Sequence, residues 1–197
     1  MKVYTARHGQ TAWNLEGRMQ GSIDIPLDAT GINQAGKLAQ RFKNIPLSAI
    51  FTSDLCRAAE TANIINKYHG LEPVVKPALR EISYGDFEGR LISDIGIQMQ
   101  GLHKAGRRLP GGETIAEFFE RIHSCLETIL PHQHGDILII GHGGTIRAML
   151  CYFMGLPPDK FSSLGIGNTS VHCFERRADG TYGIVINNDT SHLEMYS

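Results

Sequence analysis

Two histidines stand at the ends of apolar runs that are far apart in the sequence. His8 follows the run 2–6, His142 follows the run 136–140, and each has a glycine beside it. Because ligands of open α/β sheets bind at the carboxyl ends of the strands, both imidazoles would lie on one edge if the two strands are neighbours. Imidazole changes its charge near neutral pH and serves as an acid, a base or a nucleophile. Arg7, directly before His8, adds a planar guanidinium group that matches phosphate oxygens.

The segments that must position these residues alternate between short apolar strands and amphipathic helices. The run 136–140 is the most apolar, which indicates a strand buried on both faces and therefore a parallel, central one. Thr114 and Glu117 have the spacing of a capping box at the start of the clearest helix. This order of elements predicts an α/β layered fold with a largely parallel sheet. Strands are expected at 2–6, 49–52, 136–140, 170–175 and 182–187, and helices at 31–42, 55–68, 114–130 and 145–154.

Length and composition limit the classes of protein to which the chain can belong. Its 197 residues suit one domain that spans 1–197. Nineteen Lys and Arg against 20 Asp and Glu give a net charge of −1, which argues against a nucleic-acid partner held by a broad basic face. The longest apolar stretch, 148–154, is far shorter than the roughly 20 residues of a membrane span, so no membrane association is expected.

The N-terminal residues and the cysteines indicate the compartment. No apolar stretch of the kind found in secretion signals begins the sequence, which favours a cytoplasmic protein. No pair of cysteines has Cys-x-x-Cys spacing, so we expect neither a zinc ribbon nor thioredoxin chemistry but reduced, mostly buried thiols. A homo-oligomer is compatible with all of these features. The four cysteines are Cys56, Cys125, Cys151 and Cys173.

Short motifs follow one another along nearly the whole chain. The segment 5–14 contains the pattern Arg-His-Gly-x-Thr-x-x-Asn, and 141–144 reads Gly-His-Gly-Gly. Further blocks lie at 20–27, 31–35, 53–62, 79–89, 111–114 and 188–193. In this order the blocks resemble the histidine phosphatase superfamily, the phosphoglycerate-mutase-like group, and in detail its phosphatase branch, which is similar to α-ribazole phosphatase and the broad-specificity phosphatases. The resemblance implies a three-layer αβα sandwich with a mostly parallel central sheet.

The resemblance also implies a two-step phosphoryl transfer from a small-molecule phosphomonoester. His8 would attack the phosphorus and form a phosphohistidine, which water would then hydrolyse. Arg7, Arg57 and His142 would hold the phosphoryl oxygens. Glu81 would protonate the leaving oxygen and later deprotonate the water, and neither a metal ion nor another cofactor is implied. Further phosphate or substrate contacts are expected from Asn14, Gln20, Gly143, Arg107 and His192.

Elementary electrostatics supports these roles. A phosphomonoester carries about −1.5 to −2 charges near neutral pH, and Arg7, Arg57 and a protonated His142 would offset them with about +3. His8 must be neutral to attack, and two neighbouring guanidinium groups favour that form. A hydrogen bond from one of its ring nitrogens to a backbone carbonyl would leave the other nitrogen free as the nucleophile. The helix expected from Thr145 would direct its free N–H groups at the same place.

Several residues also have structural interpretations. Arg7 and Arg57 could form ion pairs with Asp24 or Glu60. Asn14 could cap a turn. The chain holds three further histidines at polar or boundary positions of the expected helices, and these are expected in solvent: His69, His103 and His123.

Two alternatives concern other acids and a metal. Glu88 and Glu113 lie near Glu81 in the motif region and are rivals for the role of acid. His132 and His134 have the spacing of two metal ligands, but they lie in a polar loop without a carboxylate nearby, so we expect no metal there.

The type of reaction is open between three classes. A phosphatase passes the phosphoryl group to water, a phosphoglycerate mutase returns it to the product, and a third possibility is a catalytically idle binding protein. The short chain and the segment 82–89 favour the phosphatase. Arg107 and Arg108 occupy the place of a basic pair in mutases, but the sequence that follows them departs from the mutase pattern. The segment 91–108 is expected to govern specificity, and its three glycines weaken any helix there.

Overall fold

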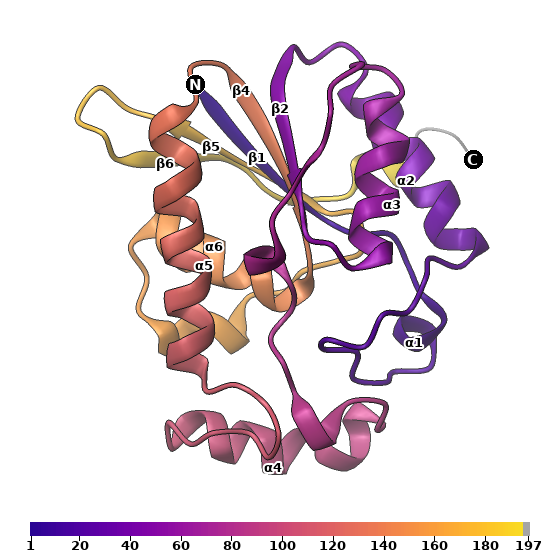
Figure 1. The fold of residues 1–197 in the computed structure, drawn as a ribbon, viewed down its shortest axis with the longest axis vertical. Helices are drawn as coiled ribbons and strands as arrows, with labels where there is room; N and C mark the ends of the chain where they lie inside the picture. The colour runs from indigo at the N-terminus through magenta and orange to yellow at the C-terminus, as the bar shows by residue number, and fades with distance from the viewer. Residues whose placement is uncertain (195–197) are drawn as a thin grey trace.

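A six-stranded sheet forms the centre of the protein in the computed structural model, which describes residues 1–194 (Figure 1). The strand order is β3-β2-β4-β1-β5-β6, with parallel pairing from β3 to β1 and antiparallel pairing of β5 and β6. β4 lies between two parallel neighbours, as its continuous apolar run predicted. The strands are β1 (Lys2–Arg7), β2 (Leu47–Thr52), β3 (Val74–Val75), β4 (Asp136–Gly141), β5 (Val171–Arg176) and β6 (Tyr182–Asp189).

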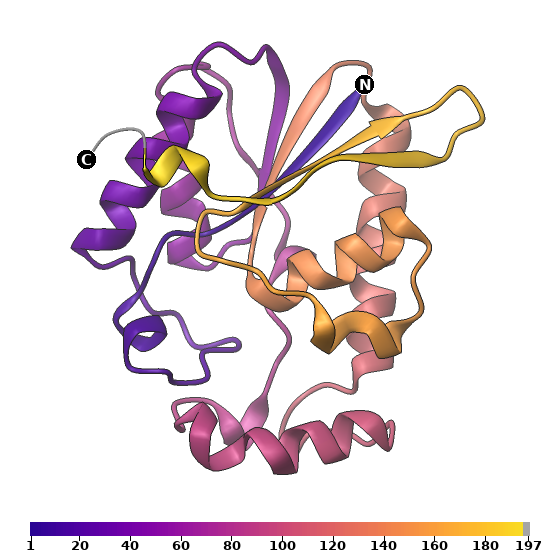
Figure 2. The same ribbon diagram turned by 180° about the vertical axis from the view of Figure 1, so that it is seen from behind.

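Helices cover both faces of this sheet, which confirms the expected three-layer αβα sandwich (Figure 2). Side chains of β4 alternate between the two cores. Ile137 and Ile139 pack in the core beneath α5 and α6, whereas Leu138 and Ile140 pack in the core beneath α2 and α3, and all four are fully buried. The helices are α2 (Ala29–Phe42) and α3 (Cys56–Asn66) on one face, and α5 (Ile115–Ile129) and α6 (Gly143–Met154) on the other.

The starts of two helices bear directly on the site. At α5 the Thr114 hydroxyl accepts a hydrogen bond from the Glu117 N–H, and the Glu117 carboxylate accepts one from the Thr114 N–H, which confirms the predicted capping box. α6 begins at Gly143, two residues earlier than expected, with His142 as its N-cap residue. The open N–H groups of α6 therefore follow directly after the second histidine of the motifs.

Helix α4 (Ile92–Lys104) lies apart from the sandwich, beyond the end toward which the parallel strands run (Figure 1). The sequence predicted that glycines would weaken a helix here, yet the helix is continuous. Ile95 is fully buried, and Met99 and Leu102 pack against the core beneath α5 and α6. This burial offsets the helix cost of about 1 kcal/mol for each glycine. The segment expected to govern specificity is thus a regular element.

Three histidines that were expected in solvent are half-buried instead. Nε2 of His69, His103 and His123 is buried without a hydrogen-bond partner in the described part of the chain. Burial lowers the pKa of His69 and of His103. The ring of His123 packs edge-on against Phe119 and Tyr152. The helical spacing of these histidines could not predict their burial, because the residues that cover them belong to other elements.

The cysteines, the lengths of the helices and the possible metal ligands lie outside the site. Three of the four cysteines are buried and Cys56 is half-buried, and all four thiols are free, as expected. None of the helices in residues 1–194 is both long enough and apolar enough to cross a bilayer. Over the same residues, His132 and His134 included, no three His, Cys, Asp or Glu side chains are grouped so as to hold a metal ion. The short elements are α1 (Ala12–Leu15), η1 (Pro77–Leu79), η2 (Gly85–Phe87), η3 (Leu130–His132), η4 (Pro158–Ser163) and η5 (Ser191–Leu193).

Candidate active site

A cavity of about 350 Å³ opens at the carboxyl ends of β1 and β4. Arg7 at the end of β1 is opposite Gly141 at the end of β4, so the histidines that follow them leave neighbouring strands at the same level. The ring centroids of His8 and His142 are 5.2 Å apart. The expectation that both imidazoles share one sheet edge is therefore confirmed. Of the site residues expected from the sequence, seven line this cavity: Arg7, His8, Asn14, Gln20, Arg57, Glu81 and Gly143.

His8 has the hydrogen bonding that a nucleophilic imidazole requires. Its Nδ1 lies 2.6 Å from the Gly9 carbonyl oxygen. A carbonyl only accepts, so Nδ1 carries the proton, and Nε2 keeps a lone pair with no hydrogen bond to any described residue. Burial, followed by the charges of Arg7 and Arg57, holds the pKa of His8 well below its usual value. The ring is thus neutral near pH 7 and presents one unprotonated nitrogen, as expected from the sequence.

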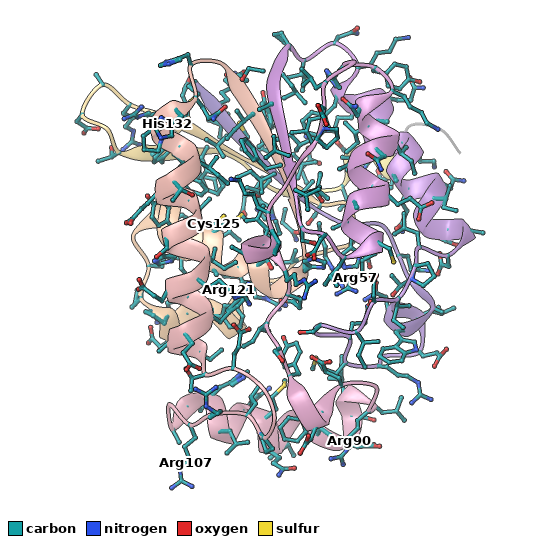
Figure 3. The ribbon with its side chains drawn as sticks, viewed as in Figure 1. Arg57, Arg90, Arg107, Arg121, Cys125 and His132 are labelled. Atoms are coloured by element: carbon teal, nitrogen blue, oxygen red, sulfur yellow. The ribbon has the colours of Figure 1, made fainter. Side chains whose placement is uncertain are left out.

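Arg57 and His142 form a fixed pair beneath His8. Arg57 is 1% exposed and donates from Nη1 and Nη2 to the carbonyl oxygens of Ile23 and Gly21, both at 2.8 Å. Its Nε donates to Nδ1 of His142 at 3.2 Å. Since a guanidinium group only donates, Nδ1 of His142 accepts, and Nε2 donates to the Ser53 hydroxyl at 2.7 Å. Arg57 is labelled near the ends of the strands, on the side of α3, in Figure 3.

The charge of His142 differs from the expectation. Burial, followed by the neighbouring charges of Arg57 and Arg7, holds its pKa well below the usual value. The expected protonation of His142 is therefore wrong. Two guanidinium groups, and not three cations, supply the charge next to His8, because His142 already accepts the N–H of one of them.

Arg7 completes the positive wall of the cavity. Its Nη1 donates to the Ile166 carbonyl oxygen at 2.9 Å, while its Nε is buried without a hydrogen-bond partner among the described residues. Burial lowers its pKa to about 10. Neither Arg7 nor Arg57 lies within ion-pair distance of a carboxylate in residues 1–194, so the alternative pairing with Asp24 or Glu60 is wrong. Two guanidinium groups without an ion-pair partner in one cavity favour binding of an anion.

Glu81 is the carboxylate at the cavity wall. Its Oε2 accepts the N–H of Gly144 and its Oε1 the N–H of Ile82, both at 2.9 Å. The two rival carboxylates are engaged elsewhere and are not among the residues that line the cavity. Glu88 accepts the N–H groups of Ser22 and Tyr84, and Glu113 forms an ion pair with Arg121. The geometry therefore favours Glu81 over Glu88 and Glu113 as the acid.

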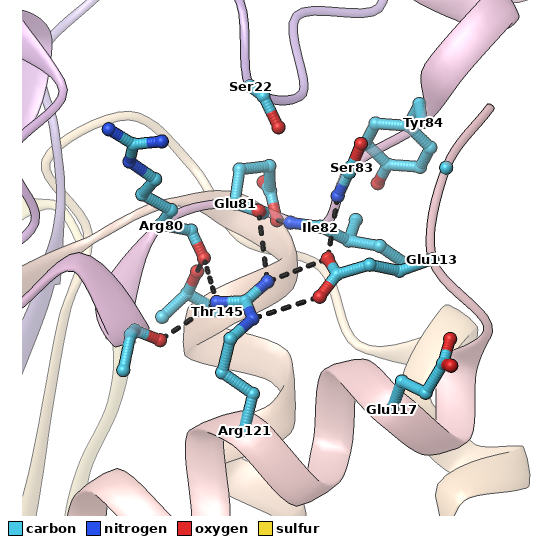
Figure 4. Close-up of polar contacts among 12 residues, drawn as sticks. Ser22, Arg80, Glu81, Ile82, Ser83, Tyr84, Glu113, Glu117, Arg121 and Thr145 are labelled. Carbon is cyan, nitrogen blue, oxygen red and sulfur yellow. Dashed lines mark hydrogen bonds and ion pairs between the residues drawn. The ribbon is translucent and has the colours of Figure 1, made fainter.

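Arg121 of α5 holds the segment that carries Glu81 (Figure 4). Its Nε and Nη2 donate to the carboxylate of Glu113 at 2.9 and 2.7 Å. Its Nη1 donates to the carbonyl oxygens of Ala78 and Arg80 at 2.8 and 3.1 Å, and its Nη2 also reaches the carbonyl oxygen of Glu81 at 3.3 Å. No sequence motif includes this residue. The available signal was an arginine directly beside the apolar stripe of the clearest helix.

Asn14, Gln20 and Gly143 lie at the cavity as expected. Asn14 is part of a capping box with Thr11 at α1, and its Oδ1 also accepts from Asn168 at 3.2 Å. Asn14 therefore has both of the places expected for it, in a cap and at the cavity wall. Gln20 is 8% exposed, and its Oε1 has no partner among the described residues. Gly143 begins α6 and turns the helix N-terminus toward Arg7.

Arg107 and His192 do not belong to the cavity. Arg107 is exposed, follows the end of α4 and points away from the sandwich (Figure 3). His192 is fully buried, with Nε2 at 3.2 Å from the Thr169 hydroxyl and Nδ1 at 3.4 Å from Arg41. Burial lowers the pKa of His192 to about 4. The expected place of both residues at the cavity is therefore wrong, since Arg107 lies in solvent after α4 and His192 is packed against Thr169 and Arg41.

Comparison with known proteins places the chain in a family. The family model described as histidine phosphatase superfamily (branch 1) matches residues 3–189. A relative from Yersinia pestis with the name probable phosphoglycerate mutase GpmB is 35% identical over 206 residues, which cover 99% of this chain and 96% of that protein. The chain therefore belongs to the histidine phosphatase superfamily, as its motifs predicted.

Solved structures show the same fold. A phosphoserine phosphatase from Entamoeba histolytica in complex with 3-phosphoglyceric acid has a TM-score of 0.85 and 28% identity, with 98% of both chains covered. An Escherichia coli protein described as a putative α-ribazole-5′-P phosphatase has a TM-score of 0.86 with 96% of this chain and 97% of that chain covered, and at 23% identity it supports the fold alone. The neighbours support an enzyme with a phosphatase type of reaction.

Proposed function

We propose that this member of the histidine phosphatase superfamily is a phosphomonoesterase that hydrolyses small-molecule phosphate esters through a phosphohistidine on His8. The observation that carries the proposal is the free Nε2 of a neutral, buried His8 in a cavity with two guanidinium groups that have no carboxylate within ion-pair distance among the described residues. A nucleophile and a charge that matches a phosphoryl dianion are thereby present in one place.

In the first step, Nε2 of His8 attacks the phosphorus, and the bond from phosphorus to the ester oxygen breaks. Arg7, Arg57 and the N–H of Gly143 bind the phosphoryl oxygens, aided by the positive N-terminus of α6. Protonated Glu81 gives its proton to the leaving alkoxide, so that an alcohol departs. The Gly9 carbonyl continues to accept the Nδ1 proton and stabilises the positive ring of the phosphohistidine.

In the second step, ionised Glu81 takes a proton from water as the water oxygen attacks the phosphorus. The bond from phosphorus to Nε2 breaks and inorganic phosphate forms. Glu81 is then protonated and His8 neutral, as at the start of the cycle. Backbone N–H groups of Gly144 and Ile82 keep the carboxylate at the cavity wall through both steps. No step uses a metal ion, and we propose that none is needed.

A mutase is the second candidate, because the Yersinia pestis relative has the name probable phosphoglycerate mutase. Incubation with 3-phosphoglycerate separates the two reactions. Release of inorganic phosphate supports the phosphatase, and formation of 2-phosphoglycerate supports the mutase. Acid-labile phosphate on His8 in near-stoichiometric amount supports either enzyme against an idle binding protein. Absence of both turnover and phosphohistidine over a panel of metabolite phosphates would refute the proposal.

A further inference from the structure

The turn that leads into β5 is bound to the backbone of the nucleophile. The Thr169 N–H donates to the carbonyl oxygens of Arg7 and His8, at 3.1 and 3.4 Å, and the Arg7 N–H donates to the Ser170 carbonyl oxygen at 3.3 Å. The Asn168 side chain adds a hydrogen bond from Nδ2 to the His8 carbonyl oxygen at 3.1 Å. Two consecutive residues of the turn therefore hold the carbonyl group of His8.

A buried histidine supports this turn from the side away from His8. Thr169 is fully buried and has a φ of 54°, in the left-handed region that a β-branched residue rarely adopts. Its hydroxyl oxygen lies 3.2 Å from Nε2 of His192. Arg41 donates to Nδ1 of His192 at 3.4 Å, so Nε2 carries the proton and donates to the Thr169 hydroxyl. His192, which does not reach the cavity, thus stabilises the turn that carries Asn168.

The orientation of the Asn168 amide follows from its neighbours. The His8 carbonyl only accepts, so the amide atom beside it is the NH2 nitrogen, Nδ2. An NH2 group has two protons, and the second is donated to Oδ1 of Asn14 at 3.2 Å. The same Oδ1 lies 3.2 Å from the N–H of Thr11, which only donates. Two independent backbone groups therefore agree on how both amides are turned.

With its oxygen engaged, Asn14 has its NH2 group left for the cavity. Its Oδ1 also accepts from the Thr11 hydroxyl at 3.2 Å, so three donors surround this oxygen. Nδ2 of Asn14 makes no hydrogen bond with any described residue, and Asn14 lines the cavity. An amide turned the other way would present an oxygen, which repels the oxygens of a phosphoryl group. The orientation of Asn14 thus decides whether it attracts or repels that group.

We infer that Asn168 is a positioning residue, which holds Asn14 in the orientation that presents its NH2 group to the phosphoryl oxygens. This inference rests on the proposed function and on the expected contact of Asn14 with the phosphoryl group. Asn168 is half-buried and is not among the residues that line the cavity, so it acts through Asn14 and not on the substrate. Its other hydrogen bond, to the His8 carbonyl oxygen, ties Asn14 to the backbone of the nucleophile.

Asn168→Asp reverses the polarity of this contact at constant size. The new carboxylate should attract the NH2 group of Asn14 and turn the amide oxygen toward the cavity. We expect kcat/KM on p-nitrophenyl phosphate to fall by about 10- to 100-fold, the effect of losing a hydrogen bond to a charged group.

Asn188→Asp is the matched control beside the same turn. Asn188 is exposed and uses the oxygen of its amide, which accepts the Gly167 N–H at 3.3 Å. Aspartate keeps that acceptor and adds the same charge as Asn168→Asp. The control should therefore leave kcat/KM within about twofold of the wild-type value.

A double-mutant cycle shows whether the effect passes through Asn14. Asn168→Ala should lower kcat/KM by about 3- to 10-fold, because the N–H and hydroxyl of Thr11 still hold Oδ1 of Asn14. In the Asn14→Ala background, Asn168→Ala should change kcat/KM by less than about twofold. The inhibition constant of vanadate, a mimic of the phosphoryl group during transfer, should follow the same pattern. Thermal unfolding checks that all variants fold.

Two results would overturn the inference. One is a loss from Asn168→Ala that is as large in the Asn14→Ala background as in the wild-type protein, because Asn168 would then act by another route. The other is an equal kcat/KM for Asn168→Asp and Asn188→Asp, because the charge alone would then explain any loss.

Failure of the proposed function can be told apart from failure of this inference. If no ester is turned over, calorimetric titration of the same variants with vanadate measures the cycle as binding. Weaker binding in Asn168→Asp and Asn168→Ala, unchanged binding in Asn188→Asp and no further effect in the Asn14→Ala background support the inference. Equal binding of vanadate by all variants, or no binding by the wild-type protein, refutes it.

Discussion

The substitution Gly144→Ala tests the place of Glu81 without removing any functional group. A Cβ atom on Gly144 would lie 2.2 Å from Oε1 and 3.1 Å from Cδ of Glu81. Oε2 at 3.5 Å is the next nearest atom, so the three closest atoms all belong to this carboxylate. To restore an ordinary contact, the carboxylate must move by about 1 Å. Gly144 lies within α6, where alanine favours the helix by about 1 kcal/mol, so the protein should still fold.

A shift of about 1 Å in a catalytic group lowers rates by about 100-fold, which is also the lower range for loss of an acid–base group. We therefore expect kcat of Gly144→Ala on an alkyl phosphate such as glycerol 3-phosphate to fall about 100-fold. The first step with p-nitrophenyl phosphate should fall much less, because nitrophenolate leaves with little need of a proton. The second step still needs Glu81, so the phosphohistidine should accumulate.

Rapid-quench kinetics measures both effects. With p-nitrophenyl phosphate, Gly144→Ala should release nitrophenol in a burst of about one equivalent, followed by a slow steady rate. Gly36→Ala in α2 is the control, because nothing lies within 4 Å of its new Cβ, and it should behave as wild type. If Gly144→Ala retains wild-type kcat on the alkyl ester and its melting temperature is unchanged, the assignment of Glu81 as the acid is wrong.

Four further expectations follow from the site. His8→Ala should remove turnover, by at least about 100-fold, and leave no acid-labile phosphate on the protein; retention of more than a few per cent of the activity would refute the nucleophile. Arg121→Met should lower the free energy of unfolding by about 2 kcal/mol and reduce kcat on alkyl esters more than on p-nitrophenyl phosphate, and an equal reduction on both would argue against its hold on Glu81. Activity should survive EDTA, and loss that zinc or magnesium reverses would show that a metal takes part. Burial lowers the pKa of His8, His142 and His192 in the folded protein, so below about pH 6.5 the unfolded chain binds more protons than the folded one. The free energy of unfolding should therefore fall from pH 7 to pH 5, by up to about 1.4 kcal/mol per pH unit for each of these histidines. Urea titrations that show no fall would contradict the buried neutral rings.

The sequence sufficed for features that depend on local pattern. The apolar run 136–140 identified the central strand, and the spacing of Thr114 and Glu117 identified the start of α5. The two histidine motifs identified one edge of the sheet because strand ends bring distant segments together. These predictions needed only periodicity, capping chemistry and topology.

Features that depend on distant neighbours could not be predicted in this way. The neutral state of His142 follows from burial and from the N–H of Arg57, which the sequence places 85 residues away. The regular helix α4 follows from burial of Ile95 against other elements, which outweighs the cost of its glycines. Arg107 and His192 were assigned by their place in motifs, and only the path of the chain shows that neither reaches the cavity.

Three of the four arginines that line the cavity have no carboxylate within ion-pair distance in the described part of the chain, and the fourth, Arg18, is paired with Glu16. In the described part of the chain, five arginines are paired with a carboxylate: Arg18, Arg41, Arg80, Arg108 and Arg121. The side chains of Arg7, Arg57 and Arg147 are held instead by backbone carbonyl oxygens and, for Arg57, by a neutral histidine. Neutral acceptors fix the position of a guanidinium group without cancelling its charge.

This arrangement explains why three cations can be kept in one cavity. A carboxylate partner would compete with the substrate and would have to be displaced at each turnover. Carbonyl oxygens need no displacement, so the field that an incoming phosphate meets is already oriented, which is the condition for strong electrostatic stabilisation of a transition state. The cost is burial of the charge together with a smaller mutual repulsion from Arg147 and Arg57, which lower the pKa of Arg7 to about 10. Binding of an anion relieves that repulsion, and the relief contributes to affinity.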